Sequence, residues 1–135
     1  MGYSNNRKKD KLPPFVPLTW ELLNSPAYKE LSHSAAKALP FFLGKVKISP
    51  RRTDRYDQEF HFSYGEGKKL GFATATFSRV IKGLVALGFI DPVDRGGLRG
   101  DSKSYNIFKL SRRWEAHGKP EFKSISWEKF LPRTV

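Results

Sequence analysis

The stretch of sequence that decides the fold is residues 69–90, KLGFATATFSRVIKGLVALGFI. After a short turn at residues 71–74, apolar residues recur at helical spacing, which predicts a helix capped by Thr74 and running to about Leu87. Its predicted buried face consists of Phe77, Val80, Ile81, Leu84, Val85 and Leu87. The opposite face is small, polar and basic, and no acidic residue lies between Gly71 and Ile90. Short side chains and cations on an open helix face suit the major groove of DNA.

The neighbouring segments predict a second helix and a small sheet. Ser63 and Glu66 have the spacing of a capping box, so a helix is expected from there to about Leu70. Gly88 stands where a helix-ending glycine belongs. Strands are expected at residues 60–62, 89–93 and 103–110, with a glycine-rich loop between the last two.

The order helix, turn, helix, strand, glycine loop, strand over residues 60–110 resembles the winged helix-turn-helix proteins of bacteria, phages and plasmids. The resemblance implies an α+β fold with a three-helix core, a small antiparallel sheet and extensions at both ends. It also implies DNA binding in replication initiation or transcription regulation, and leaves those two roles open.

The chain divides into a basic arm at residues 1–14, a winged-helix domain at 15–118 and an extension at 119–135. Helical turns are expected after three capping residues, Thr19, Ser25 and Ser32. Pro40 is expected to kink or end the last of these helices. Val46 and Ile48 alternate with lysines, as in a short edge strand. The extension is apolar enough to pack on the domain or on a partner.

The composition indicates a polyanionic partner. Lysine and arginine number 25 against 13 acidic residues, giving a net charge of +12 and a pI of about 10.1. Such a balance favours nucleic acid first and an anionic membrane second. The chain has no cysteines, which excludes disulfides and zinc-thiolate sites and favours a cytoplasmic protein. When bound to DNA, such a protein would be associated with the nucleoid. No membrane-spanning or signal segment is recognised.

The predicted DNA contacts fall on the helix, the glycine loop and the arm. Arg79 can pair with guanine or hold a phosphate, and Lys82 is placed to meet the backbone. Arg99 is the natural contact at the loop tip, although the nearby Asp101 leaves open a protein partner for this loop. The full set is Thr74, Ala75, Thr76, Ser78, Arg79, Lys82, Arg95, Arg99, Lys103, Arg7, Lys8 and Lys9.

Other functions fit the sequence less well. The three histidines lie in different elements without metal-ligand spacing, and neither glycine cluster matches a phosphate loop. We therefore expect no enzymatic activity and no metal site. We also expect no membrane partner and no small-molecule cofactor. Two alternatives to double-stranded DNA stay open. One is a protein–protein or oligomerisation module, including a homodimer, that depends on Trp127 or Phe130. The other is RNA binding with aromatic stacking.

Overall fold

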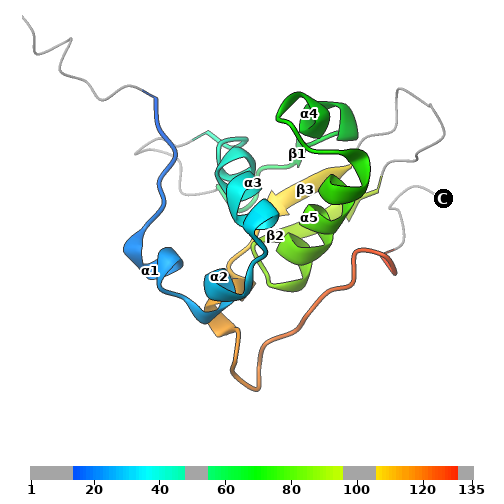
Figure 1. Cartoon of the computed structure of the whole chain (residues 1–135). Coiled ribbons are helices and arrows are strands. Elements are labelled where there is room, and N and C mark those ends of the chain that lie inside the picture. Colours follow the sequence, from blue (N-terminus) through cyan, green and yellow to red (C-terminus); the bar gives the residue numbers. More distant parts are fainter. Residues whose placement is uncertain (1–13, 48–54, 96–105, 131–135) are drawn as a thin grey trace, which may run out of the picture.

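The computed structural model describes residues 14–47, 55–95 and 106–130 (Figure 1). Within them the chain has an α+β fold of helices and a three-stranded antiparallel sheet, as the sequence predicts. Helix α3 (His33–Leu43) packs against α5 (Thr74–Ala86), and α4 (Tyr64–Lys69) packs against the same helix. The short helices α1 (Trp20–Leu23) and α2 (Pro26–Glu30) precede α3.

The N-terminal helices begin at the predicted capping residues. The Thr19 side chain accepts a hydrogen bond from the Leu22 N–H at 3.2 Å. Ser25 caps α2 and Ser32 caps α3 in the same way, each at 3.1 Å. These bonds satisfy donors that a helix leaves without an internal partner, so the three predicted caps are confirmed.

The structure corrects the expectations for α3 and for the segment after it. Of the two outcomes expected at Pro40, a kink or an end of the helix, the end is wrong, because the helix continues to Leu43. Burial of Phe42 and Leu43 on its inner face holds the last turn, although proline removes one backbone donor. Val46 is not in a strand but is buried beside a loop, and the Lys47 backbone there bonds the Gln58 side chain instead of a neighbouring strand. Ile48 lies outside the described residues.

Helix α4 has the predicted capping box. The Ser63 hydroxyl accepts from the Glu66 N–H at 3.1 Å, and the Glu66 carboxylate accepts from the Ser63 N–H at 2.9 Å. Burial raises the pKa of Glu66, but hydrogen bonds from Lys45 and the Ser63 backbone outweigh it, so the pKa lies below its ordinary value.

The sheet has the strand order β1–β3–β2, with β1 (Phe60–His61), β2 (Ile90–Asp94) and β3 (Ile107–Leu110). Both outer strands run antiparallel to β3, which pairs Phe60 with Phe108 and Ile90 with Leu110. Strand β1 is one residue shorter than expected, and β2 has the expected length but lies one residue later. Strand β3 begins at Ile107, and residues 103–105 of the expected strand lie outside the described residues. A register shift between Pro92 and Asp94 interrupts the pairing of β2 with β3. Strand β2 lies at the edge of the sheet, where a proline is tolerated.

The core is a cluster of aromatic rings around Phe77, the buried centre of α5. Rings from α3, α4 and the flanking segments approach it with centroid separations of 5.2 to 6.1 Å, namely Phe42, Phe62, Tyr64 and Phe72. This packing covers the apolar face of α5 and leaves its opposite face outward.

Candidate nucleic-acid interface

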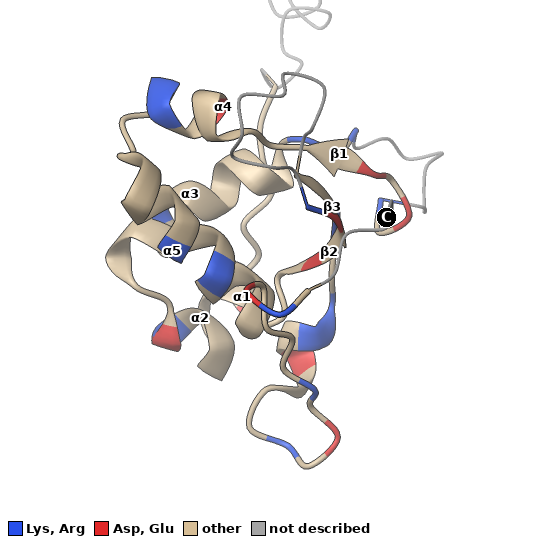
Figure 2. Ribbon diagram, turned by 90° about the vertical axis from the view of Figure 1, so that its right-hand side faces the viewer, with Lys and Arg blue, Asp and Glu red and all other residues tan. Residues whose placement is uncertain are grey.

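The outward face of α5 brings together the helix residues that the sequence singles out. Thr74, Ala75, Arg79 and Lys82 are exposed. Thr76 and Ser78 are half-buried at the sides of the same face. Figure 2 shows basic positions along α5 and no acidic ones. The helix therefore offers small, hydroxyl-bearing and cationic side chains to an external partner.

The start of α5 differs from the other α-helices of the described residues. The N-cap is Ala73, not the expected Thr74, which is instead the first helical residue. No side chain caps this end, whereas a serine or threonine caps α1, α2, α3 and α4. The first-turn amides and the positive end of the helix dipole therefore face outward without an acidic side chain.

Arg79 lies along the surface of its own helix. Its guanidinium donates to the Thr76 hydroxyl at a distance of 3.5 Å, one turn earlier. Both residues border a groove of about 570 Å³ between α5 and the start of α3. Ser32 and Ser34 border the groove from the α3 side. The serine, threonine and arginine side chains on the border of this groove can form hydrogen bonds with a ligand.

Lys82 already has an acidic neighbour. Its Nζ lies 3.3 Å from the Glu128 carboxylate, which comes from a distant part of the chain. The two side chains are 55% and 65% exposed, so the pair lies at the surface where solvent weakens it. Figure 2 shows an acidic and a basic position of the C-terminal part close to α5.

Glu128 belongs to residues 119–130, which we call the C-terminal strap. The strap follows the C-terminal half of α5 (Figure 1) and inserts Trp127, 1% exposed, against Phe108 of the sheet. The Ser124 hydroxyl donates to the Ala86 carbonyl at the end of α5 at 3.0 Å. Because Trp127 is buried within its own chain, it offers no free surface to a partner. Phe130, the other residue named for the oligomerisation alternative, is half-buried, and that alternative stays a prediction.

Arg95, one of the expected DNA contacts, lies against this strap. Its Nη1 donates to the Trp127 and Glu128 carbonyls at 3.2 and 3.0 Å. Its guanidinium also lies 5.1 Å from the centre of the Trp127 ring. These contacts give Arg95 a part in holding the strap, which the sequence pattern did not predict.

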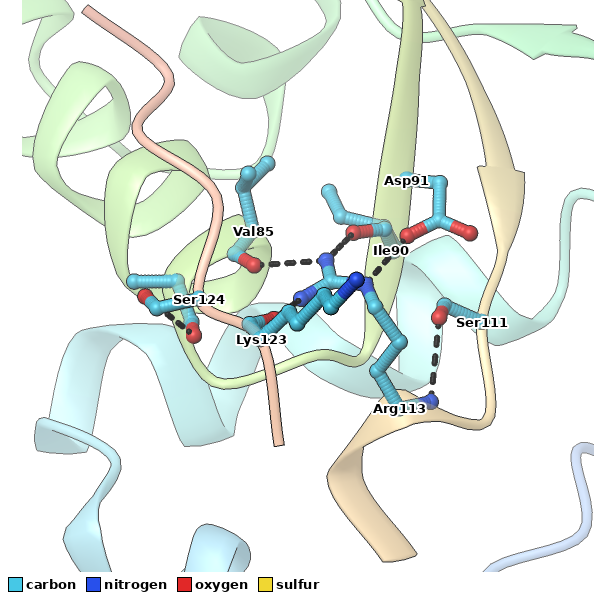
Figure 3. Close-up of polar contacts among 8 residues, drawn as sticks. Val85, Ile90, Asp91, Ser111, Arg113, Lys123 and Ser124 are labelled. Atoms are coloured by element: carbon cyan, nitrogen blue, oxygen red, sulfur yellow. Dashed lines mark hydrogen bonds and ion pairs between the residues drawn. The ribbon is translucent and has the colours of Figure 1, made fainter. Parts of the chain in front are cut away.

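Arg113 ties α5, the sheet and the strap together (Figure 3). Its Nε donates to Asp91 at 2.7 Å, and its Nη2 donates to the carbonyls of Val85 and Ile90 at 2.8 and 3.1 Å. Its Nη1 donates to the Lys123 carbonyl at 2.8 Å. A guanidinium is favourable here because the carbonyls at a helix C-terminus carry partial negative charge. This residue helps to fix the orientation of α5.

The remaining expected contacts fall outside the described residues. These are Arg7, Lys8 and Lys9 of the arm and Arg99 and Lys103 of the glycine loop. Lys68 and Lys69, which the sequence reasoning did not include, are exposed at the end of α4, just before the turn into α5. Their position in the last turn of the preceding helix was the available signal.

Residues 14–47, 55–95 and 106–130 contain no group of three His, Asp or Glu side chains that could hold a metal ion. Over the same ranges, no helix combines the length and the apolar character that crossing a bilayer requires. His117 instead pairs with Glu30, and His61 lies 3.3 Å from Glu66.

Comparisons of the chain with protein-family models, curated proteins and solved structures find no match.

Proposed function

We propose that this chain is a winged helix-turn-helix protein that binds double-stranded DNA with α5 in the major groove. The order of α3, β1, α4, α5, β2 and β3, and the sheet order β1–β3–β2, support this arrangement. In it, α4 and α5 are the helix-turn-helix, and the connection between β2 and β3 is the wing. Replication initiation and transcription regulation are the two processes that such a protein would serve.

The observation that carries the proposal is the exposed face of α5. This face combines Arg79, Lys82 and Thr76 with the small Ala75. Arginine can pair with guanine through two hydrogen bonds, and alanine leaves room for a thymine methyl group. Covering the core does not require the exposed face of a helix to lack acidic residues, whereas binding to a polyanion favours their absence.

The ends of the interface favour phosphate contacts. The uncapped start of α5 presents backbone amides without an acidic neighbour, which suits an anion. Lys68 and Lys69 lie just before this start. Together with the net charge of +12, these groups predict binding that weakens steeply as the salt concentration rises, because releasing counterions from the DNA into a saltier solution gains less free energy.

The first experiment is fluorescence anisotropy of the full chain with random-sequence duplex DNA, matched single-stranded DNA and double-stranded RNA. We expect the duplex DNA to bind most tightly, with an affinity that falls strongly between about 50 and 200 mM salt. Preference for RNA would favour the RNA-binding alternative. No salt-sensitive binding to any of the three would refute nucleic-acid binding by this chain.

The Arg79→Ala variant tests whether α5 is the helix that lies in the major groove. Without the base contacts of Arg79, the difference in binding free energy between preferred and other duplex sequences should fall by on the order of 1–3 kcal/mol. Lys119→Ala, with the same change in charge in the exposed loop after the 3₁₀ helix at Arg113–Ala116, is the control. Equal discrimination by the two variants and the wild type would argue against α5 as the groove-binding element.

A second candidate, a protein–protein or oligomerisation module, is favoured by exposed apolar side chains at the N-terminal end of the described chain. Trp20 is 79% exposed and Phe15 is 62% exposed, and Phe41 of α3 is 46% exposed. Exposed apolar groups of this size are frequent in protein interfaces. Sedimentation of wild type and Trp20→Ala tests this candidate, because a dimer that uses this surface should dissociate in the variant.

A further inference from the structure

The strap places an acidic side chain in an ion pair with the outward face of α5. The carboxylate of Glu128 lies 3.3 Å from the Lys82 ammonium. Lys82 follows Arg79 by one turn on this face. A phosphate that approaches Lys82 therefore meets a cation whose charge is already offset by a carboxylate.

The Glu128 side chain is not needed to hold the strap. The backbone carbonyls of Trp127 and Glu128 accept the Arg95 hydrogen bonds, and the Trp127 ring supplies the buried contact. The carboxylate itself is 65% exposed. The strap thus fixes the position of this charge through neighbouring groups, and the charge can be removed without releasing the strap.

We propose that Glu128 is a residue of the DNA interface that limits affinity for duplex DNA, acting by holding Lys82 in the free protein. The inference rests on the proposed DNA binding. Contact between Lys82 and a phosphate must break the ion pair and leave a carboxylate close to a polyanion. This cost arises wherever Lys82 contacts a phosphate, and phosphate contacts are made on every duplex sequence. Glu128 therefore weakens binding to duplex DNA whatever its sequence.

The test measures the affinity of Glu128→Gln for a random-sequence duplex by fluorescence anisotropy at several salt concentrations. We expect binding about two- to fivefold tighter than wild type, the range of an exposed ion pair. The salt slope should steepen by about one unit, because Lys82 becomes free to neutralise a phosphate. Thermal unfolding of the variant should match the wild type, since the strap contacts remain.

Two further variants separate a local effect from a change in net charge. Glu21→Gln makes the same charge change on α1, on the other side of α3 from α5 (Figure 1), and should change affinity and slope less. In a Lys82→Gln background, Glu128→Gln should lose most of its effect, since no cation remains to be released.

A failure of the role of Glu128 and a failure of DNA binding give different results in these experiments. Duplex binding by wild type that is unchanged in Glu128→Gln, or changed as much by Glu21→Gln, would refute the role of Glu128 while leaving DNA binding intact. An undiminished effect in the Lys82→Gln background would also refute it. Absence of salt-sensitive duplex binding in every variant would refute DNA binding itself and the inference with it.

Discussion

Gly67 lies where α4 passes directly over the ring of Phe77. A Cβ atom at this position would lie 2.7 Å from the Phe77 Cγ and Cδ1 atoms. Phe77 is fully buried among other aromatic rings, so it has little room to move. We expect Gly67→Ala to lower the free energy of unfolding by about 1–3 kcal/mol, as overpacked core variants do, measured by denaturant unfolding.

The same helix offers a matched control. At Gly65 a Cβ would meet only the Ser63 hydroxyl, at 3.6 Å. Gly65→Ala should therefore leave stability unchanged or raise it by up to about 1 kcal/mol, because alanine favours a helix. A similar loss at both positions would show that backbone conformation, not the Phe77 contact, requires glycine.

The lowered pKa of Glu66 predicts acid sensitivity. Because the pKa is lower in the folded state, Glu66 adds stability that is complete above its unfolded value, near 4.3, and is lost as the pH falls through the folded value. Glu66→Gln keeps an acceptor for the capping box but does not titrate. The stability gap between wild type and variant should therefore be largest near neutral pH and shrink below about pH 4.

Denaturant unfolding of both proteins between about pH 3 and pH 7 makes this comparison. A gap that stays constant over the whole range would mean that the ionisation of Glu66 does not contribute to stability. A gap that widens in acid would contradict the direction of the pKa shift.

Among the elements, the joint at Arg113 is where α5 meets the sheet and the strap. Its guanidinium reaches Asp91 and three backbone carbonyls at once. Lysine keeps the charge but cannot span these positions, because its donors share one nitrogen. We expect Arg113→Lys to lower the free energy of unfolding by about 1–3 kcal/mol.

The adjacent Arg112→Lys is the control for this measurement. Arg112 is exposed and pairs with Glu115 within one turn, so the substitution should leave stability close to that of the wild type. If denaturant unfolding shows equal losses of stability in the two variants, the contacts of Arg113 are not the cause of its loss.

Elements that depend on neighbouring residues were predictable from the sequence. The capping residues, the helix at Thr74–Ala86 and the turn at Gly88 follow from spacings of one to four residues. A helix end at Pro40, one of the two outcomes expected there, does not occur because the packing of Phe42, a tertiary effect, holds the helix beyond it. The Thr74 cap was misjudged by one residue, since the pattern of apolar positions does not distinguish the cap from the first helical residue.

The candidate interface was predictable only in part, because some of its contacts join residues that are far apart in the sequence. The face of α5 follows from helical periodicity and needs no tertiary information. The pairing of Lys82 with Glu128, and the contacts of Arg95 with the strap, join residues more than thirty positions apart. No local pattern in the sequence indicates which part of a chain returns to such a surface.

For the whole molecule, the shared core predicts that the strap unfolds together with the domain. Trp127 of the strap and Trp114 of the 3₁₀ helix are both buried, and Trp127 packs on Phe108 of the central strand. Small domains joined by one core usually unfold in a single transition. We therefore expect tryptophan fluorescence and far-UV circular dichroism to give the same midpoint on heating.

The measurement is cleanest in a Trp20→Phe background, because Trp20 is exposed and would report on solvent instead of the core. The remaining tryptophans are then Trp114 and Trp127. A further Trp127→Phe change leaves Trp114 alone as the reporter of the domain. If the fluorescence of the two-tryptophan protein changes before the circular dichroism, and that early change disappears with Trp127, the strap detaches first. The position of Glu128 beside Lys82 would then be lost before the domain unfolds.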